Sequence, residues 1–225
     1  MSGWTEGTDP DCLRPGEAAT LLAGHPWRRF AVLGDSVAEG IGDPVDGYRR
    51  CGLTDRVATA LATHRPDLAY LNLGRRDLRA AEVRARQLAA ALDFGPDLAM
   101  VVCGANDALR PGYDAGAVDA ELAAMVTALR DRGAEVLTVS LFILTTRPDA
   151  PPRLSPAFAH RMAVLAERTT ALAAALGTVH IGLTGHPRQS DPGLLSADGL
   201  HGNDRSHAVA AAVAVRRLGA HLAGR

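Results

Sequence analysis

Three short polar motifs in the sequence carry side chains that could together attack an acyl carbonyl. They are Gly34-Asp35-Ser36, Gly104-Ala105-Asn106-Asp107 and Asp198-Gly199-Leu200-His201. A serine at a strand-to-helix turn can present its hydroxyl to a cleft and its own N–H to an oxyanion. A carboxylate three residues before a histidine can accept the imidazole Nδ1 proton and leave Nε2 free to take the serine proton. The motifs therefore predict Ser36 as a nucleophile, His201 as its base and Asp198 as the orienting acid. Asn106 is predicted to be an oxyanion donor.

Each motif has a more ordinary interpretation when it is taken alone. Gly-Asp-Ser after a strand is most often a turn, Asn-Asp is usually a helix cap, and Asp-Gly-Leu-His is an ordinary loop in most chains. Asp35 could serve as a second base, but a hydrogen-bonding role within the turn is the stronger interpretation. His201 and His207 with Asp198 or Asp204 could bind a metal. Because their spacing matches no standard ligand motif, we expect His207 to be structural and no metal to be bound.

The elements that must position these residues are short apolar runs, each followed by a helical period. The runs predict five strands, over residues 30–33, 69–73, 98–103, 136–142 and 179–182. Unbroken apolar runs are typical of strands buried on both faces, as in a parallel sheet. Alternation of strands with helices implies right-handed crossovers and a doubly wound α/β sheet. In open sheets of this kind, ligands lie beyond the carboxyl ends of the strands, where the first two motifs occur.

Apolar residues at spacings of three and four predict the longer helices. These helices cover 114–132, 158–176 and the stretch from Asn203 or Asp204, both good N-caps, to about Leu222. The stretch 145–156 holds four prolines and is predicted to be a loop. A lid over the site is an alternative to a simple connection.

Length and composition limit the class of protein. The chain has 225 residues, of which 47% are hydrophobic and 22% charged. These values predict a single domain, residues 1–225, with residues 1–28 as an N-terminal extension packed on it. The formal net charge of −1 gives no reason to expect nucleic acid or an anionic membrane as a partner. All 24 basic residues are arginine, so no lysine can act as a base or form a Schiff base.

The N-terminus and the cysteines bear on the cellular compartment. The first residues show neither the basic region nor the apolar region of a signal peptide, and no apolar stretch reaches membrane-spanning length. Three widely spaced cysteines argue against a disulfide scaffold. We therefore expect a cytoplasmic protein without a membrane span.

In order and placement, the three motifs resemble those of the SGNH or GDSL hydrolase family. The family's first block matches Gly34-Asp35-Ser36, its third block matches residues 104–107, and its fifth block matches Asp198 and His201. The resemblance extends from about Phe30 to the last helix. It implies a three-layer α/β/α sandwich with a flavodoxin-like sheet of five parallel strands and no cofactor. It also implies that a small-molecule acyl ester is cleaved through a Ser-His-Asp triad.

Gly42-Asp43-Pro44 and Gly47-Tyr48 resemble an actinobacterial-like branch of that family. Two positions depart from the family pattern. Val37 replaces the leucine that follows the serine, which is a minor apolar exchange. In the second block the family has an Asn with a Gly five residues later, whose N–H completes the oxyanion hole. Here Asn72 is followed at that distance by Asp77. The Asp77 N–H is therefore the predicted third donor, beside those of Ser36 and Asn106, and Gly74 is the alternative if the loop is shifted.

Arginines surround the second block. Arg75 and Arg76 flank the expected oxyanion loop, so an anionic group on the substrate is a hypothesis, although such a run usually forms a solvated face. Three functions stay open: an esterase or O-deacylase, an acyltransferase of secondary metabolism that uses the same triad, and a catalytically silent small-molecule binding protein. The esterase is the leading hypothesis, because the serine, asparagine, aspartate and histidine occur together.

Overall fold

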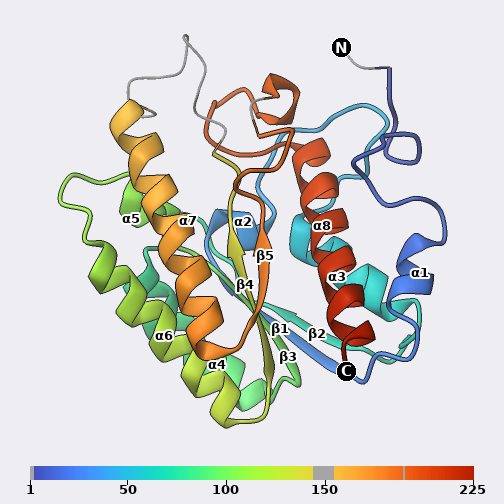
Figure 1. Cartoon of the computed structure of the whole chain (residues 1–225), viewed down its shortest axis with the longest axis horizontal. Coiled ribbons are helices and arrows are strands. Elements are labelled where there is room, and N and C mark those ends of the chain that lie inside the picture. Colours follow the sequence, from blue (N-terminus) through green and yellow to red (C-terminus); the bar gives the residue numbers. More distant parts are fainter. Residues whose placement is uncertain (1–2, 144–154, 190) are drawn as a thin grey trace.

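A computed structural model describes residues 3–143, 155–189 and 191–225 of the chain. Its centre is a sheet of five parallel strands in the order β2-β1-β3-β4-β5 (Figure 1). The strands are β1 (Arg29–Gly34), β2 (Ala69–Asn72), β3 (Leu98–Val102), β4 (Glu135–Ser140) and β5 (Val179–Gly182). Their bounds differ from the predicted ones by at most two residues, and the predicted five-stranded parallel sheet is confirmed.

Helices cover both faces of this sheet and give the predicted three layers. Helices α3 (Leu53–Ala62) and α8 (Asp204–Ala223) cover one face, and the short α1 (Glu17–Leu21) packs against both of them. Three others pack on the opposite face: α4 (Ala80–Phe94), α6 (Ala115–Asp131) and α7 (Pro156–Leu176). Short helical turns lie beyond the carboxyl ends of the strands or just before the last helix: α2 (Ser36–Glu39), α5 (Ala105–Ala108) and the 3₁₀ turn η2 (Pro192–Leu194).

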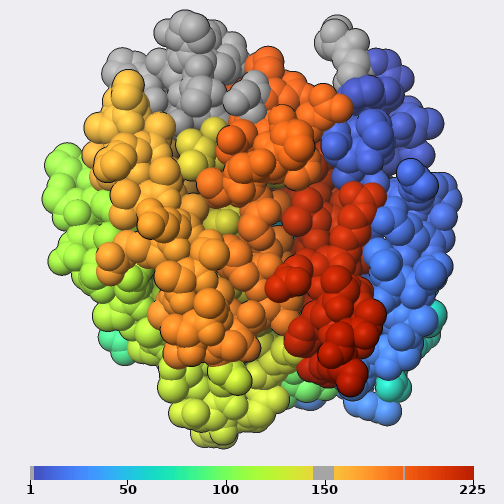
Figure 2. Space-filling view, viewed as in Figure 1, coloured from blue at the N-terminus to red at the C-terminus, as the bar shows by residue number. Residues whose placement is uncertain are grey.

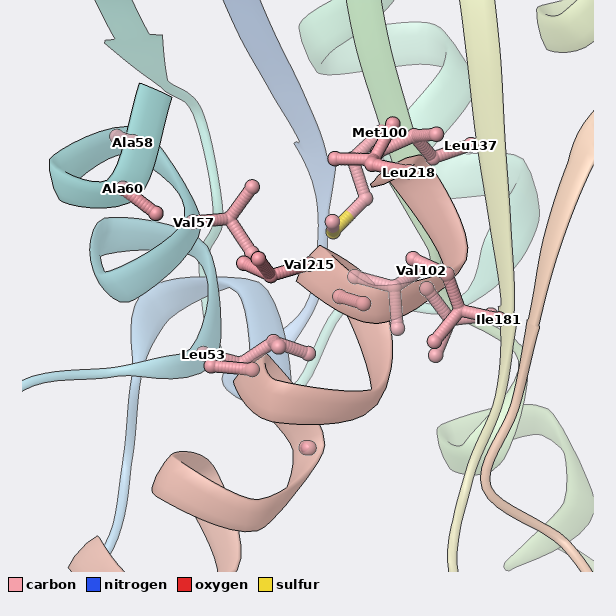
Figure 3. Packing of buried hydrophobic residues seen from close by; sticks show 14 of the residues in the cluster. Leu53, Val57, Ala58, Ala60, Met100, Val102, Leu137, Ile181, Val215 and Leu218 are labelled. Carbon is pink, nitrogen blue, oxygen red and sulfur yellow. The ribbon is translucent and has the colours of Figure 1, made fainter. Parts of the chain in front are cut away.

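The sheet contributes alternate side chains to two hydrophobic clusters. Along β1, Phe30 and Val32 belong to the cluster beneath α3 and α8, whereas Leu33 belongs to the cluster beneath α4, α6 and α7. This division follows from the alternation of side chains along a strand. Figure 3 shows the first cluster, in which Val57 of α3 and Val215 of α8 lie beside side chains of the central strands. The central strands β1, β3 and β4 are therefore buried on both faces, whereas the edge strands β2 and β5 are only partly buried.

The three longer helices begin at side-chain caps. Asp114 accepts hydrogen bonds from the first amides of α6, and Ser155 accepts one from the Phe158 N–H of α7. Asn203 accepts one from the Ser206 N–H and so fixes the start of α8 just after the Asp198–His201 motif. Such caps satisfy amides that have no partner inside the helix.

Part of the proline-rich stretch lies outside the described residues. Residues 145–154 belong to that part, so the lid hypothesis stays a prediction, while Pro156 is the first residue of α7. In the three described ranges, no helix combines the length and the apolar character that crossing a membrane requires.

Candidate active site

Ser36 lies at the sharp turn between β1 and α2. A Cβ atom on Gly34 would come within 2.2 Å of the Val102 carbonyl oxygen, so only glycine lets the chain leave the sheet at this point. The Asp35 carboxylate then accepts a hydrogen bond from the Val37 N–H at 3.1 Å and caps α2. Ser36 is therefore the first residue of a short helix, where its N–H needs no helical partner.

The structure brings the hydroxyl, the imidazole and the carboxylate of the first and third motifs into one hydrogen-bonded row. His201 Nε2 lies 3.0 Å from Ser36 Oγ, and His201 Nδ1 lies 2.6 Å from Asp198 Oδ2. The other Asp198 oxygen accepts hydrogen bonds from the N–H groups of Leu200 and His201. Burial raises the pKa of Asp198, but the hydrogen bonds from His201 and Leu200 lower it by more. The carboxylate is consequently ionised near neutral pH and holds the Nδ1 proton of the imidazole.

Residues of the loop after α2 hold the turn that carries His201. The Asp43 carboxylate accepts a hydrogen bond from the Ala197 N–H at 2.6 Å, and the Asp43 N–H donates to Ser196 Oγ at 2.9 Å. A Cβ atom on Gly42 would lie 2.4 Å from the Gly202 carbonyl oxygen. This contact between the Gly42-Asp43-Pro44 motif and the histidine turn has no signal in the sequence, because 153 residues separate Asp43 from Ser196.

Asn106 lies at the start of α5, beyond the end of β3. Its side-chain amide donates one hydrogen bond to the Leu78 carbonyl at 3.0 Å, and the residue borders the same cavity as Ser36 and His201. A side-chain amide has two N–H donors. The second donor of Asn106 is therefore available to a ligand in that cavity.

Hydrogen bonds in the loop after β2 distinguish between Asp77 and Gly74 as the third oxyanion donor. The Gly74 N–H donates to Asn72 Oδ1 at 2.9 Å, so it is not available to a substrate in this conformation. The amides of Arg75 and Arg76 are also taken, by the Gly34 carbonyl and the Glu39 carboxylate. In the described part of the chain, nothing accepts a hydrogen bond from the Asp77 N–H.

Asp77 has an unusual backbone conformation. Its φ is +69°, and no other non-glycine residue in the described ranges has a positive φ. Residues with a Cβ atom seldom adopt this left-handed region, although Asp and Asn tolerate it better than most. Glycine, which the resemblance to the hydrolase family implies at this position, adopts this conformation without strain.

The structure does not place Arg75 and Arg76 at the cavity beside Ser36. Both are exposed, and the Arg76 guanidinium donates to the Glu39 carboxylate of α2 at 2.8 Å. Neither residue is among those that border the cavity. The hypothesis that they bind an anionic substrate group is therefore not supported by this geometry, since Arg76 is already paired with a carboxylate.

A cavity of about 90 Å³ opens beside Ser36 and His201, and its walls are mainly apolar. The apolar side chains that border it come from helices α2, α3, α5, α7 and α8 and from the loops after α2, α5, β4 and β5: Val37, Ile41, Leu53, Ala105, Leu109, Leu141, Phe142, Ile143, Phe158, Met162, Leu183, Leu200 and Ala210. Phe158 and Met162 lie in the helix predicted over 158–176 and are buried, and their role in the cavity wall had no signal in the sequence.

His207 has a structural role near the cavity. Its Nδ1 accepts a hydrogen bond from the Leu53 N–H at 3.1 Å, and its Nε2 donates to the Ile41 carbonyl at 3.0 Å. Burial lowers the pKa of His207, so the ring is neutral at pH 7. Both ring nitrogens are taken, and no group of His, Cys, Asp and Glu in the described ranges is arranged like a metal site.

The model of the GDSL-like lipase/acylhydrolase family matches residues 32–209, which contain all three motifs. No curated protein matches the sequence. Solved structures with a similar fold include LAE5, an alpha/beta hydrolase enzyme from the metagenome of Lake Arreo, Spain. It is 18% identical to this chain, with a TM-score of 0.68 over 85% of this chain and 95% of its own.

Two other structures show the same fold. TesA is 22% identical, with a TM-score of 0.65 over 84% of this chain and 97% of its own. The acetylxylan esterase Axe2 of Geobacillus stearothermophilus is 15% identical, with a TM-score of 0.67 over 85% of this chain and 94% of its own. The family match spans most of the sequence and includes the turn of Ser36 as well as that of His201. The chain therefore belongs to the GDSL-like lipase/acylhydrolase family of enzymes.

Proposed function

We propose that this enzyme hydrolyses carboxylic acyl esters with Ser36 as the nucleophile, His201 as the general base and Asp198 as the orienting acid. One observation carries the proposal. A single imidazole connects the serine hydroxyl, at 3.0 Å from Nε2, with a carboxylate at 2.6 Å from Nδ1. Both distances are within the range of hydrogen bonds that can transfer a proton or hold one.

The proposed reaction has two steps. His201 Nε2 takes the proton of Ser36 as the hydroxyl oxygen attacks the ester carbonyl, and the same imidazole then protonates the leaving alcohol. An acyl-enzyme on Ser36 remains. Water attacks it with the help of His201, and the carboxylic acid leaves. Asp198 keeps the Nδ1 proton in place and stabilises the positive charge that His201 carries in each step.

Three donors are proposed to hold the oxyanion of each tetrahedral intermediate. They are the N–H groups of Ser36 and Asp77 and the side-chain amide of Asn106. The Asn106 amide and the Asp77 turn are linked, because Asn106 donates its other hydrogen bond to the carbonyl of Leu78. Loss of one such donor typically costs about 3 kcal/mol of barrier, or two orders of magnitude in rate.

The cavity favours an aliphatic acyl group of small to medium size as the part of the substrate that it binds. Its walls are apolar side chains with few aromatic rings, and its volume is about 90 Å³. Burial of each methylene in such a cavity stabilises the complex by about 0.8 kcal/mol.

The assignment to an actinobacterial-like branch stays a prediction that depends on residues 42–48.

Labelling with a fluorophosphonate, followed by turnover of p-nitrophenyl esters from acetate to octanoate, tests the proposal. We expect the wild-type protein to react and Ser36→Ala to be inert. Ser140→Ala is the matched control, because Ser140 Oγ also lies 3.2 Å from a histidine, His180 Nε2, but neither residue borders the cavity. This control should react like the wild type.

Absence of labelling in the folded wild-type protein would overturn the proposal and favour a silent binding protein. Equal labelling of Ser36→Ala would show that another residue is the nucleophile. Product analysis with competing alcohols and amines addresses acyl transfer, which differs from hydrolysis only in the acceptor. Transfer in preference to hydrolysis would replace the esterase by the acyltransferase.

A further inference from the structure

The segment formed by residues 4–11, called here the N-terminal arm, lies beside the start of α8 and the loop that contains η2. Figure 2 shows the N-terminal residues, in blue, along one side of the last helix, in red. The Asp9 side chain is 0% exposed and accepts hydrogen bonds from Arg205 Nε and from the Tyr48 hydroxyl, both at 2.7 Å. The arm is thus attached to α8 by a buried charge pair.

Arg205 also binds a second carboxylate. Its Nη1 donates to Asp191 Oδ2 at 2.7 Å, while its own side chain is only 4% exposed. The other Asp191 oxygen accepts a hydrogen bond from the Gly193 N–H and caps η2. A planar guanidinium with two carboxylate partners fixes the arm and η2 relative to the start of α8.

The η2 segment also contacts the Asp198–His201 turn, which carries the proposed acid and base. Asn203 donates hydrogen bonds to the carbonyls of Gly193 and Leu195. Leu195 pairs with Gly202 as an isolated β-bridge, next to the Ser196 N–H, which donates to the His201 carbonyl at 2.9 Å. A continuous set of contacts therefore runs from the arm to His201.

Trp4 and Asp11 add three further contacts at the ends of the arm. The Trp4 ring lies 5.4 Å from the guanidinium carbons of both Arg188 and Arg205, within the range of cation–π attraction. Arg188 also forms an ion pair with Asp11 at 2.7 Å. All these arm residues precede residue 32, where the match to the family model begins.

We propose that the N-terminal arm is a positioning element for catalysis, which sets the place of the Asp198–His201 turn through Arg205. This inference rests on the function proposed above. The 3.0 Å separation between His201 Nε2 and Ser36 Oγ needs both turns in fixed positions. Asp9 and Arg205 are positioning residues, since neither borders the cavity. A displacement of about 1 Å at a reacting pair can cost on the order of 100-fold in rate.

The test compares Asp9→Asn with Glu17→Gln. Glu17 also joins the N-terminal extension to α8, through Arg216 at 2.6 Å, but this pair lies about three helical turns away from Arg205. We expect both variants to lower the urea midpoint of unfolding. Only Asp9→Asn should lower kcat, by about 10-fold or more, with KM within about two-fold, because the acyl cavity is not changed.

Trp4→Ala provides a second, milder probe if Asp9→Asn folds poorly. It should lower kcat in the same direction and slow fluorophosphonate labelling of Ser36. The inference is overturned if folded Asp9→Asn and Trp4→Ala keep the wild-type kcat, or if Glu17→Gln loses as much kcat as Asp9→Asn. Failure of the proposed function would instead appear in the wild-type protein, as a lack of labelling and of ester turnover.

Discussion

Replacement of Asp77 by glycine should leave the enzyme active and about as stable as the wild type. The Asp77 backbone has a φ of +69° and its side chain is exposed. Left-handed backbone costs a residue with a Cβ atom about 1–2 kcal/mol, while the greater freedom of glycine in the unfolded chain costs about 0.5–1 kcal/mol. The two effects nearly cancel, so the free energy of unfolding should change by about 1 kcal/mol at most. The backbone N–H proposed to hold the oxyanion is retained.

Two further substitutions at this position separate backbone strain from charge. Asp77→Ala keeps the strain but loses the local polar group that helps Asp adopt this conformation, so it should be less stable than Asp77→Gly by about 1 kcal/mol. Its kcat should fall, because a turn that relaxes out of the left-handed conformation moves the amide away from the oxyanion. Asp77→Asn keeps the shape and removes the negative charge. An exposed charge several ångströms from the oxyanion is worth about 1 kcal/mol at most, so kcat/KM should rise by up to about five-fold.

Urea unfolding and kcat/KM on a p-nitrophenyl ester, measured for all three variants, would check this reasoning. Equal stability of Asp77→Ala and Asp77→Gly would show that residue 77 does not have a left-handed backbone in solution. A loss of more than about 10-fold in kcat/KM for Asp77→Gly would show that the side chain, and not the backbone N–H, is what catalysis needs at this position.

Two other predictions concern the residues that shape the site. Burial raises the pKa of Asp35 from 3.8 to about 7, so the folded protein keeps a proton that the unfolded chain loses at lower pH. The binding of this proton stabilises the folded state, and the stabilisation is lost as the pH rises toward 7. Asp35→Asn has no such proton. Its free energy of unfolding relative to that of the wild type should therefore rise by on the order of 2 kcal/mol between about pH 5 and pH 8, as measured by urea unfolding at both values. A difference between the two proteins that does not change with pH would contradict the shift. Gly42→Ala would place a Cβ atom 2.4 Å from the Gly202 carbonyl and push the His201 turn away, so its kcat should fall by about 10-fold or more. Gly3→Ala, where a Cβ would meet nothing within 4 Å, is the control and should have the wild-type kcat, whereas full activity of Gly42→Ala would show that the turn tolerates this movement.

Sequence patterns were most informative where the structure depends on neighbouring residues. The apolar runs at β1, β3 and β4 were clear signals because strands buried on both faces need continuous apolar side chains. The caps Asp114 and Asn203 lie at the helix starts that were predicted, since capping is a contact over two or three residues. The three motifs met at the carboxyl end of the sheet because a parallel sheet brings the residues after its strands to the same edge.

Contacts between distant segments could not be derived in the same way. The loop after β2 left two candidates for the oxyanion amide, and only the hydrogen bond from Gly74 to Asn72 showed that one of them is taken. The expected role of Arg75 and Arg76 failed to gain support because the half-buried carboxylate of Glu39 binds Arg76 away from the cavity. Which arginine meets which carboxylate depends on how loops from different strands pack.

By itself, the sequence determined the class of sheet, the helices that cover it and the residues proposed to perform acyl chemistry, because periodicity, caps and short motifs are local properties of the chain. Only the tertiary structure decided which amides stay available, which side chains border the acyl cavity and how Asp9 contacts Arg205 across 196 residues. These features follow from packing between segments far apart in the chain, for which no local pattern exists.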